Sequence, residues 1–98
     1  MVIFADAARA DLKAIAMWIG GDNPDRAATF VAEIRRACET LARHPKRFPL
    51  VAGSRREGLR KRNVRGYLIF YRVTGHDVEI VRVVQGARDW AALLDARG

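Results

Sequence analysis

The stretch YLIFYRVTGHDVEIVRVV (residues 67–84) decides the fold of this chain. Residues 67–73 and 78–84 are rich in β-branched and aromatic side chains, which favour extended strands. The residues between them have the composition of a hairpin loop. A further strand is expected from Leu59 to Val64, ahead of a turn at Arg65-Gly66. The pattern therefore predicts a three-stranded antiparallel meander.

The strand at residues 67–73 carries apolar side chains on both of its faces. Because successive side chains point to opposite faces, Leu68 and Phe70 are expected on one face and Ile69 and Tyr71 on the other. Each apolar face must be covered. Helices from the N-terminal half can cover one face, and the other is left to a segment at residues 87–96, to a partner chain, or to both.

A short strand and a helix are predicted at the start of the chain. Residues 2–4 are β-prone, and apolar residues then recur at helical spacing from Ala8 to Ile19. Asp6 is expected to cap this helix at its N-terminus. Gly20-Gly21 is expected to end it in the left-handed conformation.

A second helix is expected to begin at Asn23 as N-cap, with Pro24 as its first helical residue. The short link to the first helix predicts an antiparallel helical hairpin. Cys38 falls on the apolar stripe of the second helix, so it is interpreted as core rather than nucleophile. His44 near the helix end needs no catalytic role, and residues 46–58 read as a surface loop. The expected fold class is α+β.

Composition limits the class of protein. The chain has 98 residues, half of them hydrophobic, which predicts one core and a single domain over residues 1–98. The formal net charge of +7 favours polyanionic partners: nucleic acid, an acidic protein segment or an anionic membrane. A basic surface that only aids solubility is the plain alternative.

The sequence gives no sign of a metal, a cofactor or a membrane anchor. Cys38 is the single cysteine, so an intrachain disulfide and a Cys-x-x-Cys metal cluster are excluded. The N-terminus does not resemble a signal peptide, and no apolar stretch reaches the roughly 20 residues that span a bilayer. We therefore expect a cytoplasmic protein without cofactor.

Several segments, taken in order and spacing, resemble one known family. They are Ala8-x-x-Asp11-Leu12-x-x-Ile15, Asn23-Pro24-x-x-Ala27, Leu41 with Pro45, Gly58-Leu59-Arg60, residues 67–73, Val78-Glu79-Ile80-x-Arg82-Val83 and Gly86-Ala87-Arg88-Asp89. Together they resemble ParE-type toxins of the ParE/RelE superfamily over nearly the whole chain.

The resemblance implies a fold with an N-terminal strand, a helical hairpin, a three-stranded antiparallel meander and a short C-terminal helix. It implies a toxin of a type II toxin-antitoxin system that is neutralised by a ParD-like antitoxin with an acidic, amphipathic C-terminal segment. The implied target is DNA gyrase, and operator DNA would be reached only through the antitoxin. No contact with a membrane is implied.

The RelE side of the superfamily, whose members cut messenger RNA on the ribosome, gives an alternative function. Lys61 and Arg88 fall where such enzymes carry a lysine and a phosphate-binding arginine. Leu68 and Leu94 fall where they carry an arginine and a tyrosine, and leucine neither moves a proton nor holds a phosphate. We therefore assign no catalytic residue. A third reading is a non-toxic partner that is kept for repression of its operon.

Two sets of surface residues are predicted. The antitoxin-binding set is Trp18, Arg60, Lys61, Arg65, Tyr67, Tyr71, Trp90, Leu93 and Leu94. The target-binding set is Arg55, Arg56, Arg60, Arg62, Arg82 and Arg88. Three alternatives stay open: the basic segment 55–65 as a solvated edge strand, the last apolar residues as core, and Arg88 as a brace within the fold. Gln85 stands where many ParE-like sequences have histidine.

Overall fold

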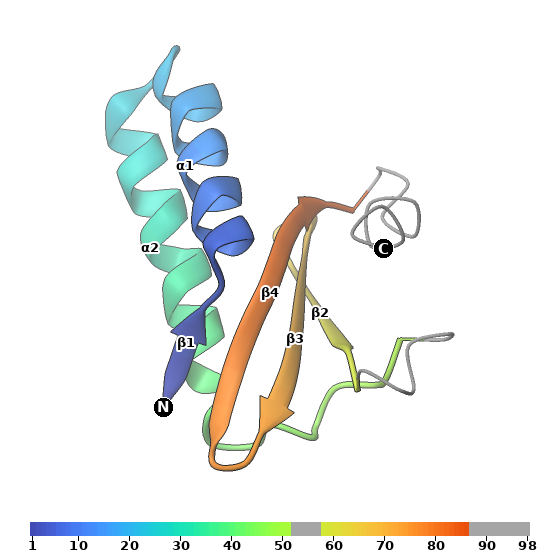
Figure 1. Cartoon of the computed structure of the whole chain (residues 1–98). Helices are drawn as coiled ribbons and strands as arrows, with labels where there is room; N and C mark the ends of the chain where they lie inside the picture. The colour runs from blue at the N-terminus through green and yellow to red at the C-terminus, as the bar shows by residue number, and fades with distance from the viewer. Residues whose placement is uncertain (52–57, 87–98) are drawn as a thin grey trace.

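The computed structural model describes residues 1–51 and 58–86. Its elements follow the predicted order (Figure 1). They are β1 (Val2–Phe4), α1 (Asp6–Gly20), α2 (Pro24–Thr40), β2 (Arg60–Val64), β3 (Tyr67–Thr74) and β4 (Asp77–Gln85). The α+β class, the helical hairpin and the antiparallel meander are thus confirmed. The expected C-terminal helix and its covering role lie outside the described residues.

The four strands form one sheet in the order β1-β4-β3-β2. β2, β3 and β4 pair antiparallel, with an irregularity of register between Phe70 and Tyr71. β1 joins the free edge of β4 in parallel, opposite residues 78–80. Since β1 is only three residues long, the rest of that edge of β4 lies beyond it.

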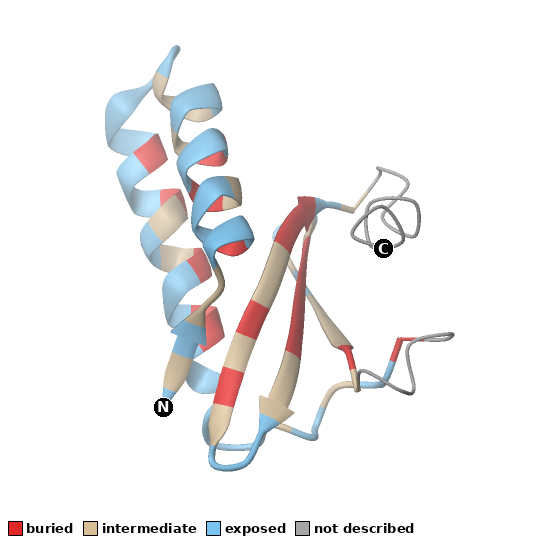
Figure 2. Cartoon of the chain, in the orientation of Figure 1, coloured by how far each residue is buried: buried red, intermediate tan, exposed pale blue. Residues whose placement is uncertain are grey.

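Two apolar clusters lie on the two faces of the sheet. The larger one packs α1 and α2 against a face that includes Ile69 and Tyr71 (Figure 1). The smaller one holds Leu68 and Phe70 together with Val84 on the opposite face. The alternation predicted for β3 is confirmed by these two clusters. Figure 2 shows buried and partly buried positions alternating in the first half of β4.

The two helix junctions differ in how well local sequence predicts them. The Asn23 side chain accepts a hydrogen bond from the Arg26 backbone N–H at 3.0 Å, so the predicted N-cap of α2 is confirmed. The cap expected of Asp6 is wrong, because the helix begins at Asp6 itself and its side chain makes no cap hydrogen bond. Gly21 is right-handed, with φ at −58°. The turn instead closes through the N–H of Asn23, which donates to the Ile19 carbonyl at 2.9 Å.

Cys38 lies fully buried in the larger cluster, as predicted from its place on the apolar stripe of α2. Burial raises the pKa of its thiol to about 12, although Arg62 and Arg35 act in the opposite direction. The thiol is therefore neutral and inert at physiological pH.

Within residues 1–51 and 58–86, no helix has the length and apolar character needed to cross a membrane.

Candidate interaction surfaces

Alternation along β2 decides where its basic side chains point. Arg60 and Arg62 stand opposite Tyr71 and Ile69 in the register, on the face that the helices cover. Lys61 stands opposite Phe70, on the other face. The basic side chains of β2 therefore lie on two faces of the sheet rather than on one surface.

Arg60 braces the turn that follows α2. Its Nη1 donates to the backbone carbonyl of Phe48 at 2.6 Å and to that of Lys46 at 3.2 Å. A charged donor bound to carbonyls in a partly buried position holds the turn firmly. Arg60 was predicted to bind both the antitoxin and the target, and the structure gives it this intramolecular role as well.

Arg62 braces the C-terminal end of α2. Its Nη1 donates to the carbonyl of Ala37 and to Oγ1 of Thr40, both at 2.8 Å. The last carbonyls of a helix have no partner within the helix, so an arginine there satisfies them and also complements the helix dipole. The guanidinium stands 5.1 Å from the centroid of the Phe48 ring.

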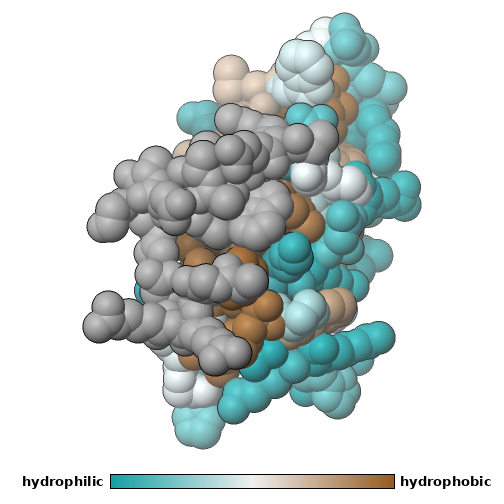
Figure 3. All heavy atoms as spheres, turned by 90° about the vertical axis from the view of Figure 1, so that its right-hand side faces the viewer, coloured by the Kyte–Doolittle hydropathy of each residue, from teal (hydrophilic) through white to brown (hydrophobic). Residues whose placement is uncertain are grey.

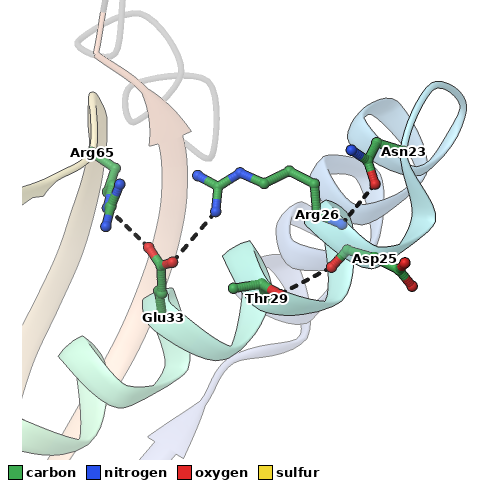
Figure 4. A network of polar contacts seen from close by, with 6 residues as sticks. All are labelled: Asn23, Asp25, Arg26, Thr29, Glu33 and Arg65. Carbon is green, nitrogen blue, oxygen red and sulfur yellow. Dashed lines mark hydrogen bonds and ion pairs between the residues drawn. The ribbon is translucent and has the colours of Figure 1, made fainter.

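Arg65 belongs to a small polar network on α2 (Figure 4). Its Nε lies 2.9 Å from Oε2 of Glu33, and Nη1 of Arg26 lies 3.4 Å from Oε1 of the same carboxylate. The contact with Arg65 is an ion pair without hydrogen-bond geometry, because Oε2 is buried and receives no hydrogen bond. At the start of α2, Asn23 caps the helix and Thr29 donates to the Asp25 carbonyl (Figure 4). The network ties the β2–β3 turn to α2.

Arg82 was predicted to bind the target, but its guanidinium is engaged inside the fold. It donates to both oxygens of Asp11, through Nε at 2.7 Å and Nη2 at 2.9 Å. The hydrogen bond to Asp11 raises the pKa of Arg82, so the guanidinium is charged. The structure gives Arg82 this forked pairing within the fold, beside the target-binding role that the sequence predicts for it. Asp11 itself was overlooked as a partner, because nothing near it in sequence marks it.

Tyr71 was predicted at the antitoxin surface, and this is wrong because its side chain is fully buried. Its hydroxyl donates to the Pro45 carbonyl at 2.7 Å, and burial raises its pKa. Tyr67 is partly buried instead, packed edge to face on Phe30 with the ring centroids 5.3 Å apart. The alternation that buries Tyr71 was already visible in the sequence.

An open groove lies between α1 and the ends of β3 and β4. Its volume is about 300 Å³. It is lined by Asp11, Ala14, Ile15, Trp18, Tyr67, Val83, Val84 and Gln85. Trp18 is 80% exposed and the neighbouring Met17 is 70% exposed. The groove thus combines an exposed indole with walls of apolar and polar residues, and it brings together two residues predicted for the antitoxin, Trp18 and Tyr67.

The sheet face away from the helices carries Lys61 and Leu68, two of the positions that the sequence sets against RelE-type enzymes. Leu68 is buried there in the smaller apolar cluster with Phe70 and Val84, while Lys61 stands opposite Phe70 in the register. Figure 3 looks onto this side, where apolar atoms lie beside hydrophilic ones. Leu68 therefore supplies hydrocarbon where the nuclease carries an arginine.

By the register of β3 and β4, Glu79 stands on that face and pairs with Arg72 at 2.6 Å, while both histidines lie in turns. His76 lies in the β3–β4 hairpin, and His44 lies in the turns after α2. Within the part of the chain that the structure describes, no three His, Cys, Asp or Glu side chains gather into a metal site. The predicted site residues Arg55, Arg56, Arg88, Trp90, Leu93 and Leu94 lie outside the described residues.

The family model for the ParE toxin of the type II toxin-antitoxin system, parDE, matches residues 2–90. The chain belongs to this toxin family. A solved structure described as the chromosomal ParDE TA system from P. aeruginosa matches this ParE-family chain with a TM-score of 0.73 and 22% identity. The match covers 86% of this chain and 92% of that one, and it shows a shared fold. A search of curated proteins gave no match.

Proposed function

We propose that this ParE-family chain is a toxin that poisons DNA gyrase by binding, and that a ParD-like antitoxin neutralises it. The observation that carries the proposal is the buried Leu68, which puts hydrocarbon at a position where phosphodiester cleavage needs an arginine. RelE-type cleavage uses groups that move a proton and stabilise a crowded phosphate, and Leu68 does neither. Surface complementarity is then the means of action.

The groove beside Trp18 is the docking site that we propose for the antitoxin. It has apolar residues in its walls, an exposed indole and partly buried Tyr67, which are the features of interface hot spots. Amphipathic segments bind such grooves through apolar anchors. A ParDE complex among the structural relatives supports a partner of this kind.

Gyrase supercoiling assays test the target. Purified toxin is expected to inhibit supercoiling and to trap a cleaved DNA complex, and addition of the antitoxin should restore activity. Unchanged supercoiling together with no cleaved complex, at a large molar excess of folded toxin, would remove gyrase from the proposal.

Ribosome-dependent cleavage of messenger RNA is the second candidate, because Lys61 lies on the same sheet face as Leu68. Translating ribosomes that receive the toxin are expected to keep their message intact. Message cleavage that disappears in Lys61→Ala would replace our proposal with the nuclease. Normal growth of cells that express folded toxin without antitoxin would instead support the non-toxic partner.

A further inference from the structure

A pocket lined by basic side chains lies where α2, the turns after it and β2 meet. Its volume is about 230 Å³. Its lining residues, which we call the basic pocket, are Thr40, Leu41, Arg43, His44, Arg47, Phe48 and Arg62. None of these lining residues is acidic, and the exposed side chain of Lys46 lies in the same turn. The pocket was not visible in the sequence, because β2 and residues 40–48 meet only in the fold.

Two guanidinium groups in the basic pocket share one aromatic ring. Arg47 and Arg62 lie 5.4 and 5.1 Å from the centroid of Phe48. Both guanidiniums are positively charged, and no ion pair of either arginine occurs in the described part of the chain. Arg26 offers a contrast, because it stacks on Phe30 but also pairs with Glu33. The basic pocket is therefore a site that an anion would stabilise.

The pocket is held in shape before any ligand arrives. Arg62 is fixed by Ala37 and Thr40, and Arg60 fixes the turn through the carbonyl of Phe48. Arg43 and Arg47 line the same pocket and are exposed. A guanidinium that is already held in place, such as that of Arg62, binds phosphate at a lower cost in entropy.

The chemistry of this end of the molecule favours nucleic acid over a protein segment. Protein interfaces centre on apolar anchors, and the exposed pair Met17 and Trp18 lies near the opposite end of the helical hairpin. Single strands are gripped by stacking on free aromatic rings, but the ring of Phe48 is half-buried and faces two guanidiniums. A site that offers guanidiniums but no aromatic ring for stacking is suited to the phosphate backbone of double-stranded DNA.

We propose that the basic pocket binds a backbone phosphate of double-stranded DNA, so that the toxin contacts DNA directly and without reading its sequence. Its volume suits one phosphate group with the adjoining sugar rather than a drug-sized ligand. The proposal is independent of gyrase: direct contact with DNA can fail while gyrase poisoning stands, and the reverse also holds.

The test measures binding of the purified full chain to a fluorescent duplex of mixed sequence, between about 50 and 200 mM salt. Each phosphate contact contributes about 0.9 to the slope of log K against log salt. Arg43→Ala/Arg47→Ala is expected to weaken binding at least about tenfold and to lower that slope by about 0.9, the share of one phosphate contact. Arg9→Ala/Lys13→Ala, which removes two exposed charges from α1, is the matched control and should keep the slope.

Each other outcome has a defined meaning, provided that thermal unfolding shows both double variants to be folded. Equal losses of affinity in the two double variants would show that the effect depends on net charge alone and would overturn the site. Tighter binding of single-stranded RNA of the same length would overturn the assignment to duplex DNA. Tighter binding of poly-glutamate than of duplex, lost in Arg43→Ala/Arg47→Ala, would assign the pocket to an acidic protein segment and overturn the proposal.

Discussion

Asp11 on α1 and Arg82 on β4, 71 positions apart in the chain, form a forked ion pair with distances of 2.7 and 2.9 Å. The same carboxylate accepts the backbone N–H of Val83 at 2.8 Å. β1 pairs with β4 only as far as Ile80, so the edge of β4 continues beyond its partner strand. Beyond the end of β1, Asp11 thus accepts a backbone hydrogen bond from this edge of β4, and it links the first helix to the sheet.

Asp11→Asn is expected to destabilise the fold by about 2 to 4 kcal/mol, because it leaves Arg82 without a counter-charge and weakens the hydrogen bond to Val83. Urea unfolding followed by circular dichroism measures the loss. Asp22→Ala, which removes an exposed carboxylate from the helix link, is the control and should cost less than about 0.5 kcal/mol. Equal stability of Asp11→Asn and the parent chain would show that the pair is not structural.

Trp18→Ala is expected to leave stability nearly unchanged, since the side chain is 80% exposed, and to weaken antitoxin binding at least about 30-fold. Calorimetric titration with the antitoxin measures the affinity. Met17→Ala is a matched control, because Met17 is 70% exposed but does not line the groove. A Trp18→Ala variant that binds as tightly as the parent chain would place the antitoxin elsewhere.

Tyr71→Phe is expected to cost about 1 kcal/mol of stability, because the Pro45 carbonyl loses the hydroxyl that donates to it. Antitoxin affinity should stay constant, as the ring is buried. Tyr67→Phe is the comparison at a partly exposed site in the groove. A change of antitoxin affinity in Tyr71→Phe at unchanged stability would contradict the buried role.

Stability is expected to fall in alkali as the pH rises above about 9. The pKa of the Cys38 thiol rises from 9.0 to about 12 in the fold, so the unfolded chain releases this proton at a lower pH than the folded chain. Because the unfolded state then binds fewer protons, the free energy of unfolding decreases with pH, by roughly 1 kcal/mol per unit. Below pH 9 the thiol contributes no slope.

Unfolding by urea at several pH values between 8 and 11 checks this expectation. Cys38→Ala is less stable at every pH because it leaves a cavity, but its stability should decline less steeply in alkali. Labelling with a thiol reagent should be slow in the folded chain and fast in urea. Rapid labelling of the folded chain at neutral pH would show that the thiol is accessible.

Elements were predicted well where the signal is local. The alternation of apolar residues at 67–84 gave β3 and β4, and the stripe with Cys38 gave α2. Asn23 followed by Pro24 predicted the exact residue at which α2 begins. These predictions succeed because backbone preference and side-chain periodicity are properties of short segments.

The contacts of the candidate site residues could not be predicted, because these side chains bind residues that lie far away in sequence. Arg60, Arg62 and Arg65 looked like one basic edge, yet they hold Phe48, Ala37 and Glu33 respectively. An arginine that binds a helix-end carbonyl has no sequence signature, since every residue carries such a carbonyl and only the fold shows which ones lack a partner.

The sequence by itself determined the order of helices and strands and the two apolar faces of the sheet, since these follow from local periodicity. The tertiary structure decided that Arg82 pairs with Asp11, that Tyr71 is internal, and that Arg47 and Arg62 meet around the ring of Phe48. The physical reason is that electrostatic contacts depend on distance in space, and the folded chain alone sets that distance.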